Sequence, residues 1–292
     1  MLINHETQIL GIIGNPIAQS LSPLMHNAVF KQAGLNCIYL PFKISADEVK
    51  RTLEAVRILN IKGINVTIPF KEKVLDYLDE LSAEAQACQA VNCIKNENGR
   101  LIGYNTDGKG FMAAITEAEV PPGTRKAVLI GAGGAARSVA YNLANNDYKL
   151  IEILDITVEK ASRLADFIEK STSCQVRYWL MNPDNFANCC LDAQLVVNCS
   201  PVGMVPNIDK SPVDSLAAVP EGAVICDLIY NPPMTKFLQL GQARGLKTVN
   251  GVAMFVHQGA LTLQILMGIN PPLAFMKDVV TNQLEGKRLN IN

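Results

Sequence analysis

The stretch 126–136, Lys-Ala-Val-Leu-Ile-Gly-Ala-Gly-Gly-Ala-Ala, decides the fold of the C-terminal part of this chain. After Lys126, residues 127–130 form a short apolar run, which is typical of a buried parallel strand. Three glycines follow within four residues, beginning at Gly131, and the next segment places Val139 and Leu143 four positions apart. A strand, a glycine-rich turn and a helix in this order predict the first unit of a doubly wound α/β sheet.

The glycine-rich turn has the composition of a phosphate-binding loop. Glycine permits the tight turn and lets the main chain approach a pyrophosphate at the helix N-terminus. Ala136 takes the third position of the G-x-G-x-x-G pattern and keeps helix and strand close. Asp155 follows the second apolar run, where a carboxylate binds the ribose hydroxyls of NAD and repels the extra phosphate of NADP. We therefore expect NAD as the cofactor, with NADP disfavoured by Asp155; an aspartate that only starts a turn is the alternative.

Short apolar runs alternate with helix-length segments along the whole chain, which is the pattern of parallel α/β units. In the C-terminal part, strands are expected at 126–130, 151–154, 175–179, 195–198, 224–228 and 247–249. In the N-terminal part they are expected at 8–13, 37–42, 63–66, 91–95 and 100–104, with a hairpin turn at 96–99. Ser22-Pro23 predicts a helix start with serine as the cap, and Gly34 predicts the end of that helix.

Composition restricts the classes of partner. The 292 residues carry 26 basic and 27 acidic side chains, so no net field favours nucleic acid or an anionic membrane. Three histidines without ligand spacing argue against a metal site. Eight scattered cysteines without a C-x-x-C pair, and an N-terminus unlike a signal peptide, favour a cytoplasmic protein with reduced thiols. The oligomeric state stays open, with a homodimer as one option.

Polar side chains cluster where the expected N-terminal strands end. They lie in four segments: Ser20-Leu21-Ser22-Pro23, residues 65–71 (Asn-Val-Thr-Ile-Pro-Phe-Lys), Val91-Asn92, and residues 103–108 (Gly-Tyr-Asn-Thr-Asp-Gly). In open α/β sheets ligands bind beyond the carboxyl ends of the strands. Hydroxyl and amide groups at that edge suit a small ligand with several hydroxyls and a carboxylate.

Each of these residues also has a purely structural interpretation. Ser22 is explained equally well as a helix cap, and Lys71 lies in a Lys-Glu-Lys run typical of a solvated turn. Asp107, before Gly108, fits the cap of a helix beginning near Gly110. The occurrence of all four segments in one chain favours the binding interpretation.

The segments together resemble the shikimate dehydrogenase family. The S-L-S-P, N-V-T-I-P-F-K, V-N, Y-N-T-D-G and G-A-G-G-A-A segments occur in the family's order. So do Asn-Cys-Ser-Pro-Val-Gly-Met at 198–204, Tyr-Asn-Pro at 230–232 and Gln-Gly-Ala at 258–260. The resemblance runs from about residue 11 to residue 260 and covers most of the chain.

The resemblance implies three regions and a set of site residues. It implies a substrate-binding and catalytic α/β domain over 1–107, a Rossmann-type NAD(P)-binding domain over 108–258, and a helical segment over 259–292 that packs back on the first domain. It assigns Lys71 and Asp107 to catalysis. Substrate contacts are implied for Ser20, Ser22, Asn65, Thr67, Lys71, Asn92, Asp107, Tyr230 and Gln258, and Tyr230 is placed at the wall between substrate and cofactor. Cofactor contacts are implied for Gly131, Ala132, Gly133, Gly134, Ala135, Asp155, Ser200, Leu228 and Gly251.

Two positions depart from the family pattern. NADP-using members carry an Asn-Arg-Thr-like run whose arginine holds the ribose phosphate, whereas this chain has Asp155-Ile156-Thr157. That difference again favours NAD, as in family members that act on quinate. The other departure is Ser200, where threonine is usual; the hydroxyl remains.

The implied reaction is reversible hydride transfer between NAD and one ring hydroxyl of a polyhydroxylated carboxylic acid, shikimate to 3-dehydroshikimate. Lys71 is the expected proton donor and acceptor, and Asp107 would position it. Burial lowers the pKa of a lysine and a nearby carboxylate raises it, so the sequence leaves the protonation state open. The alternatives are an enzyme of quinate catabolism, an NADP-dependent shikimate dehydrogenase, a non-catalytic dinucleotide sensor and, remotely, a methyltransferase.

Overall fold

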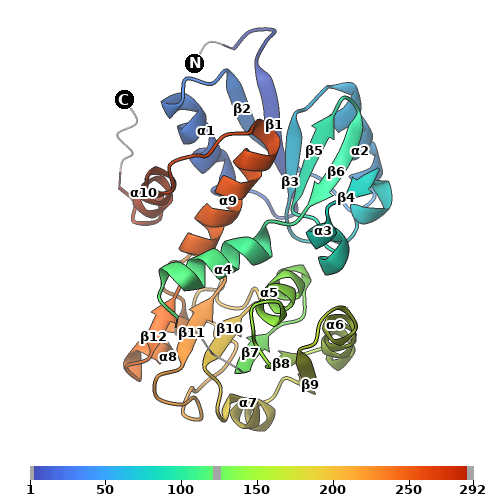
Figure 1. Ribbon diagram of the computed structural model, residues 1–292. Coiled ribbons are helices and arrows are strands. Elements are labelled where there is room, and N and C mark those ends of the chain that lie inside the picture. Colours follow the sequence, from blue (N-terminus) through green and yellow to red (C-terminus); the bar gives the residue numbers. More distant parts are fainter. Residues whose placement is uncertain (1–2, 121–125, 288–292) are drawn as a thin grey trace. The chain divides into compact units, whose positions relative to one another are not determined.

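The computed structural model describes residues 3–120 and 126–287 and divides into two compact units. The first unit is Met1–Thr106 with Val256–Asn292, and the second is Asp107–Phe255. Each unit contains one six-stranded sheet covered by helices (Figure 1). The predicted connection at Pro121-Pro122-Gly123 lies outside the described residues. The α/β fold class, with an N-terminal α/β part and a Rossmann-type part, is confirmed.

The first unit holds most of the N-terminal elements and the last two helices. Its strands are β1 (Gln8–Gly14), β2 (Cys37–Lys43), β3 (Gly63–Val66), β4 (Glu80–Leu81), β5 (Cys93–Glu97) and β6 (Arg100–Tyr104). Its helices are α1 (Ser22–Gln32), α2 (Val49–Ile58), the 3-10 turn η1 (Leu75–Tyr77), α3 (Ala83–Cys88), α10 (Leu273–Leu284) and most of α9 (Val252–Met267).

The sheet of the first unit is mixed, in the order β2-β1-β3-β5-β6-β4. β1 pairs in parallel with β2 and β3, whereas β5 runs antiparallel to β3 and β6. The core between the sheet and α2 contains Leu53, Ile64, Ile94 and Phe70, each about 1% exposed or less. Thr67 is the first residue after β3 and Lys71 lies four residues further on, so the buried strand fixes the start of the segment that carries both.

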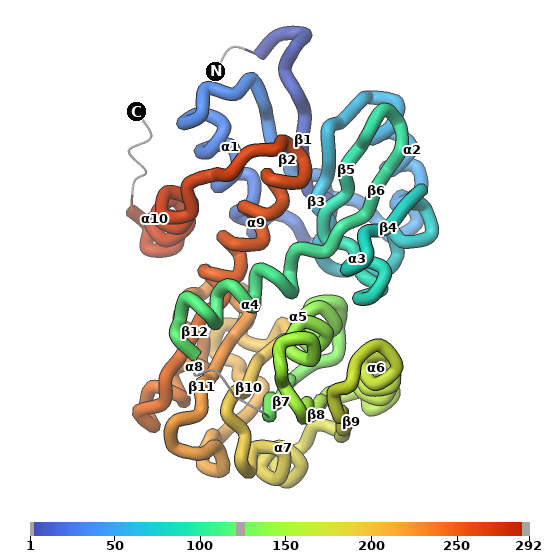
Figure 2. Tube along the Cα trace, viewed as in Figure 1, coloured from blue at the N-terminus to red at the C-terminus, as the bar shows by residue number. Residues whose placement is uncertain are grey.

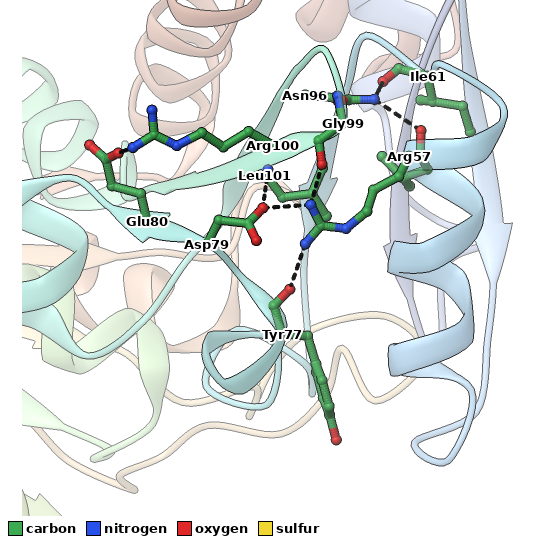
Figure 3. Close-up of polar contacts among 10 residues, drawn as sticks. Arg57, Ile61, Tyr77, Asp79, Glu80, Asn96, Gly99, Arg100 and Leu101 are labelled. Carbon is green, nitrogen blue, oxygen red and sulfur yellow. Dashed lines mark hydrogen bonds and ion pairs between the residues drawn. The ribbon is translucent and has the colours of Figure 1, made fainter.

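Polar contacts attach the β5–β6 hairpin to the C-terminal end of α2 (Figure 3). The Arg57 guanidinium donates to Asp79 Oδ2 over 2.5 Å and also to the carbonyl oxygen of Gly99. Asn96, which is 5% exposed, donates to the carbonyl oxygen of Ile61 over 3.0 Å. A buried amide needs such partners, and these contacts fix the hairpin against the helix.

The two C-terminal helices complete this unit. Figure 2 shows α10 beside α1, although they lie at opposite ends of the chain. On α9, Gly259 faces the side chain of Met25; a Cβ there would approach the Met25 methyl to 2.4 Å. Gly63 of β3 similarly leaves room for Leu266 of α9. Residues after 255 therefore belong by packing to the N-terminal sheet.

The second unit follows the order expected of a doubly wound fold. Its strands are β7 (Lys126–Ile130), β8 (Leu150–Asp155), β9 (Gln175–Leu180), β10 (Leu195–Asn198), β11 (Val224–Asp227) and β12 (Lys247–Val249). Its helices are α4 (Asp107–Glu117), α5 (Gly134–Ala144), α6 (Val158–Ser171), α7 (Pro183–Cys190) and α8 (Lys236–Ala243).

The sheet of the second unit is parallel throughout, in the order β12-β11-β10-β7-β8-β9. Helices on both faces bury it, which explains why its central strands read as continuous Val, Ile and Leu runs. Val128 and Val196 pack toward α7 and α8, whereas Leu129 and Val197 pack toward α5. From β7 the chain adds β8 and β9 on one side of the sheet and then returns to add β10, β11 and β12 on the other side. Folds of this kind bind dinucleotides at the point where the strand order reverses, here between β7 and β10.

Three local predictions differ from the structure. Ser22 is the first residue of α1 and not its cap: Leu21 takes the cap position, and no side chain caps the helix. The strand predicted at 91–95 is β5, two residues later, and the hairpin turn shortens to Asn98-Gly99. Both turn residues have positive φ, 55° and 89°, which suits a two-residue hairpin loop.

Among the residues that the structure describes, no helix is both long and apolar enough to cross a membrane.

Candidate active site

Asn65 is the centre of a buried hydrogen-bond network in the first unit. Its Oδ1 accepts from the Tyr39 hydroxyl over 2.7 Å. Its Nδ2 donates to the Asn92 carbonyl oxygen over 2.9 Å and to Thr262 Oγ1 over 3.1 Å. Ser22 joins the network through a side-chain hydrogen bond to Tyr39. The structure thus connects three of the predicted substrate-binding residues, on α1, β3 and the segment before β5: Ser22 and Asn65 through their side chains and Asn92 through its carbonyl oxygen.

A second pair of hydrogen bonds fixes the segment that leads to Asp107. Asn92 Nδ2 donates to Thr106 Oγ1 over 2.8 Å, and the Thr106 main-chain N–H donates back to Asn92 Oδ1 over 2.8 Å. Asn105 donates to the carbonyl oxygen of Ala90 over 2.9 Å. Asp107 itself is 5% exposed and is the first residue of α4. In the segment 104–107, the side chains of Asn105 and Thr106 are therefore anchored by hydrogen bonds, and Asp107 lies at the start of α4.

The remaining predicted residues of the first unit are half-buried. Ser20 Oγ accepts from the Ser22 main-chain N–H over 3.3 Å. Thr67 follows β3, and its hydroxyl has no protein partner among the described residues. Lys71 is held through its carbonyl oxygen, which accepts from the Val91 N–H over 2.8 Å. Gln258 lies on α9, away from these residues in sequence but in the same unit.

Sequence reasoning missed Tyr39 and Thr262, which hold Asn65. Thr262 lies 197 positions from Asn65, so no local pattern links them. Tyr39 lies in an apolar strand, and a buried tyrosine hydroxyl requires a partner, which is the one signal the sequence carries. His26 stacks on Tyr39 with ring centroids 4.5 Å apart. Burial lowers the pKa of His26 to about 3, and its Nδ1 is the one buried side-chain nitrogen or oxygen without a partner in the described chain.

In the second unit, the glycine-rich loop occupies the turn between β7 and α5. Gly131 has φ +103°, and a Cβ there would lie 3.1 Å from the Ser200 nitrogen. Its own N–H donates to the Leu154 carbonyl oxygen over 2.7 Å. Gly133, the N-cap of α5, has ordinary φ −84° and open space beside it. No side chain caps α5, so its first turn presents main-chain N–H groups of the kind that bind a pyrophosphate.

Asp155 bonds to the main chain through both oxygens. Oδ2 accepts from the Ala132 N–H and Oδ1 from the Thr157 N–H, each over 2.8 Å. One bond fixes the glycine-rich loop against β8, and the other fixes the turn before α6. These contacts give Asp155 a structural task that does not depend on which nucleotide is bound.

Ser200 belongs to a buried network at the ends of β10 and β11. Its hydroxyl donates to Asn198 Oδ1 over 2.7 Å, and Asn198 Nδ2 donates to Asp227 Oδ1 over 3.1 Å. Asp227 also accepts from Thr235 Oγ1 over 2.6 Å and from the Ile229 N–H over 3.0 Å. Burial nevertheless raises the pKa of Asp227 to about 6, because three hydrogen bonds only partly replace lost solvation.

Leu228, Gly251 and Tyr230 lie on the loops that follow β11 and β12. A Cβ on Gly251 would lie 2.2 Å from the Leu228 carbonyl oxygen, so only glycine allows these two loops to meet. The Gly251 N–H donates to the Ile229 carbonyl oxygen over 3.0 Å. The Tyr230 ring packs on Phe255, with centroids 4.4 Å apart. All of the predicted cofactor contacts in this unit thus lie at or just after the carboxyl ends of β7, β8, β10, β11 and β12.

Comparison with known proteins identifies the family. Residues 12–94 match the model of the shikimate dehydrogenase substrate binding domain. A relative from Syntrophomonas wolfei, "Shikimate dehydrogenase (NADP(+))", is 52% identical and covers 98% of each chain. A crystal structure of a shikimate dehydrogenase in complex with NADP+ has 38% identity and a TM-score of 0.90, covering 97% of this chain and 98% of that one. The Listeria monocytogenes enzyme with shikimate and NAD has 30% identity and a TM-score of 0.88, covering 95% and 98%.

The expectation that NAD is preferred over NADP is wrong. The Syntrophomonas relative is named for NADP+, as are relatives from other genera, and the first of the two structures holds NADP+. The inference rested on Asp155 as a ribose ligand that repels the phosphate. In the structure both oxygens of Asp155 are bonded to main-chain N–H groups, which matches the alternative of a turn-forming aspartate.

The sequence resemblance, the α/β fold with its Rossmann-type sheet, and the full-length similarity lead to one assignment. This chain belongs to the shikimate dehydrogenase family and is an NAD(P)-dependent oxidoreductase that acts on a CH–OH group.

Proposed function

We propose that this protein reversibly interconverts shikimate and 3-dehydroshikimate with NADP(H). The observation that carries the proposal is full-length similarity, 52% identity over 98% of the chain, to an NADP-linked shikimate dehydrogenase. The hydrogen-bonded polar set around Asn65 supports it, because a ring with several hydroxyls requires fixed donors and acceptors. Eight free thiols support a reducing compartment, which we take to be the cytoplasm.

The residues around the glycine-rich loop fit a dinucleotide. Gly131 leaves space that a side chain would fill, and the uncapped first turn of α5 favours an anionic pyrophosphate. For the ribose phosphate, the first turn of α6 offers the Thr157 hydroxyl, which makes no cap hydrogen bond, and the exposed Lys160. We assign the phosphate to these two groups, in place of the arginine that Ile156 replaces.

The proposed division of tasks follows the family's residues. Residues 1–107 bind substrate and carry catalysis, residues 108–258 bind cofactor, and 259–292 pack on the first part. Ser20, Ser22, Asn65, Thr67, Asn92, Tyr230 and Gln258 contact the substrate. Gly131, Ala132, Gly133, Gly134, Ala135, Ser200, Leu228 and Gly251 contact the cofactor.

When bound, the reduced nicotinamide supplies the hydride. Lys71 then donates a proton to the carbonyl oxygen on which negative charge develops, and in the opposite direction it accepts the proton of the substrate hydroxyl. The family's pattern assigns to Asp107 the tasks of positioning Lys71 and of accepting a hydrogen bond from a neighbouring ring hydroxyl. The first-unit network offers the ring donors and acceptors whose positions are already fixed, which favours a single bound orientation.

The test is the absorbance of reduced nicotinamide, with purified protein, shikimate or quinate, and NADP or NAD. We expect turnover of shikimate with NADP. Turnover of quinate alone would change the substrate, and absence of turnover in all four mixtures would defeat the proposal. Lys160→Ala should raise KM for NADP without a comparable change for NAD, whereas Lys170→Ala, in the last turn of the same helix, should change neither.

A further inference from the structure

Strand β9 forms an outer edge of the second unit's sheet and differs from the other sheet edges of the described chain (Figure 1). The β12 edge has three residues and the β4 edge two. The β2 edge carries Pro41, and the Asn27 side chain bonds both the N–H and the carbonyl oxygen of Tyr39. β9 has six residues without proline or lysine. Short strands, proline and side-chain caps protect edges from pairing, and β9 lacks the first two.

The side chains on β9 are also unusually apolar for an open edge. Tyr178 is 44% exposed, Trp179 39% and Leu180 47%, three large apolar residues in succession. A monomeric domain rarely leaves such a run exposed without a binding role. Exposed apolar side chains and an open main chain on one strand favour pairing with another strand.

The hydrogen bonds to β8 show which main-chain groups of β9 point outward. The Gln175 N–H donates to the carbonyl oxygen of Lys149, just before β8, over 3.0 Å, and the Met181 N–H to that of Asp155, the last residue of β8, over 2.9 Å. The main-chain groups of odd-numbered residues therefore face β8. The main-chain groups of Val176, Tyr178 and Leu180 therefore point to the open edge, since these groups alternate along a strand.

Two of these outward groups already have partners, and four do not. The Val176 N–H donates to Glu169 Oε1 over 3.1 Å, and the Leu180 carbonyl oxygen accepts from Asn185 Nδ2 over 2.9 Å. Within the described chain, no hydrogen bond engages the Val176 carbonyl oxygen, the Leu180 N–H, or either main-chain group of Tyr178. The open groups are thus two donors and two acceptors placed symmetrically about Tyr178.

Buried Glu152 of β8 fixes the side chains on one face of this edge. It is 3% exposed, and its Oε2 accepts from the Trp179 indole N–H over 2.7 Å. Arg177 lies 3.8 Å from Oε1 of the same carboxylate, and the Lys126 ammonium 3.6 Å. An aromatic side chain held in place before binding loses little entropy on association, as in interface hot spots.

We propose that β9 pairs with β9 of a second copy of this chain, antiparallel, about a two-fold axis that passes between the two Tyr178 residues. In this register Tyr178 exchanges both main-chain hydrogen bonds with Tyr178 of the partner subunit. The Leu180 N–H donates to the carbonyl oxygen of Val176 of the partner subunit, and the reverse bond forms by symmetry. All four open main-chain groups of each strand are then paired. The capped Val176 N–H faces the capped carbonyl oxygen of Leu180 of the partner subunit, so the side-chain caps replace the hydrogen bond that these two groups would otherwise form.

Charge and hydrogen bonding both select this register. Arg177 lies opposite Trp179 of the partner subunit, a cation over an aromatic ring, and Val176 lies opposite Leu180. A two-fold axis at Arg177 would place two arginines opposite each other, and only two of the four main-chain hydrogen bonds would form. An axis at Trp179 likewise leaves two, because the capped Leu180 oxygen would face the Tyr178 N–H. The two sheets would join into one continuous sheet.

The test begins with sedimentation of the full chain over a range of concentrations, where we expect a dimer. Tyr178→Pro removes a central donor whose N–H faces away from β8, and Tyr178→Lys places two ammonium groups at the axis. Each should weaken dimerisation at least tenfold with unchanged activity per chain, which shows that the variant is folded. Ile58→Lys, at a position 82% exposed on α2, is the matched control and should leave the dimer intact. A monomer at every concentration, or a dimer insensitive to both Tyr178 variants, overturns the proposal.

Mild oxidation of cysteine variants tests the register. Directly opposed, hydrogen-bonded residues have Cα atoms about 5.5 Å apart, within reach of a disulfide. Tyr178→Cys should give covalent dimers, whereas Arg177→Cys, which faces Trp179 of the partner subunit, should not. Seven of the eight native cysteines are buried and one is half-buried, so the background is low. Efficient cross-linking by Arg177→Cys alone would contradict the register.

Discussion

At the scale of single residues, Asn65 has little capacity left for a ligand. Both hydrogens of its amide are donated, to Asn92 and Thr262, and its oxygen accepts from Tyr39. An amide oxygen has two lone pairs, so one further hydrogen bond is open to it. Asn65 is therefore restricted to accepting from a substrate hydroxyl, whereas a substrate carboxylate requires donors such as the Thr67 hydroxyl or the Lys71 ammonium.

Lys71→Ala tests the proposed proton transfer. Removing the ammonium leaves the developing oxyanion without its donor, so we expect turnover to fall by about 10²–10⁴-fold. Cofactor affinity should change little, because Lys71 belongs to the first unit. Steady-state kinetics in both directions and fluorescence titration with reduced cofactor measure the two quantities. Unchanged turnover would remove Lys71 from catalysis, and Lys73→Ala, two residues on and exposed, serves as the control.

Asp227 gives the second unit a predictable pH dependence of stability. Its pKa rises from 3.8 to about 6 on folding, so the folded state binds the proton more tightly. That stabilisation is complete below pH 4 and is lost as the pH rises through 6, by about 3 kcal/mol at 1.4 kcal/mol per pKa unit. In Asp227→Asn this change should vanish, because an amide does not titrate in this range. The variant should remain folded, since its amide oxygen can accept from Asn198 and Ile229 and its amide N–H can donate to Thr235.

The measurement is urea unfolding of both proteins from pH 4 to 7, compared as a difference. The difference is needed because His26, in the first unit, acts in the opposite direction. Burial lowers the pKa of His26 to about 3, so its contribution is lost as the pH falls below 6.5. A difference that does not change with pH would show that Asp227 titrates normally.

At the scale of elements, two glycines of one loop should respond differently to alanine. Gly131→Ala forces a side chain into φ +103° beside Ser200, and we expect the free energy of unfolding to fall by about 1–3 kcal/mol. Gly133→Ala adds a Cβ in open space at φ −84°, so stability should change less. The main chain at Gly133 is the approach to the pyrophosphate, and KM for NADP should therefore rise. Equal loss of stability in the two variants would contradict this distinction.

The sequence predicts an element well where neighbouring residues determine it, and poorly where contacts with residues far away in the chain determine it. β7 and β10 match the predicted residues, because each is a short, mostly apolar run whose side chains are buried on both faces of the sheet. β4 has two residues and exists only through pairing with β6, which no local pattern reveals. The end of β5 depends on Asn96, whose side chain donates to the carbonyl oxygens of Val56 on α2 and of Ile61 just after it, about 40 and 35 positions away in sequence.

The same reasoning applies to the site. The motifs single out Ser22, Asn65 and Asn92, but they do not reveal the hydrogen bonds that connect these residues, since Tyr39 and Thr262 lie outside every motif. Asp155 was misread for a related reason. Its position at the end of β8 is visible in the sequence, whereas its hydrogen bonds to the main chain of Ala132 and Thr157 form only in the folded unit.

At the scale of the whole molecule, the cysteines divide between the two units and can report on each. The first unit contains Cys37, Cys88 and Cys93, and the second contains the other five. Burial raises the pKa of Cys93 and of Cys189 to about 12, so these thiols are unreactive in the folded chain. Labelling with a thiol reagent, counted by mass spectrometry along a urea gradient, therefore measures the unfolding of each unit.

Each unit has its own sheet and core, so we expect the thiols to become reactive in two groups, of three and of five. A ligand that binds only the folded form stabilises it by RT ln(1 + [L]/Kd), about 2.7 kcal/mol at a hundredfold excess over Kd. NADP should then shift the group of five to higher urea and leave the group of three nearly in place, because the glycine-rich loop lies in the second unit. Exposure of all eight thiols in one transition, shifted as a whole by NADP, would instead mean that α4 and α9, whose chain segments connect the units, make them unfold together.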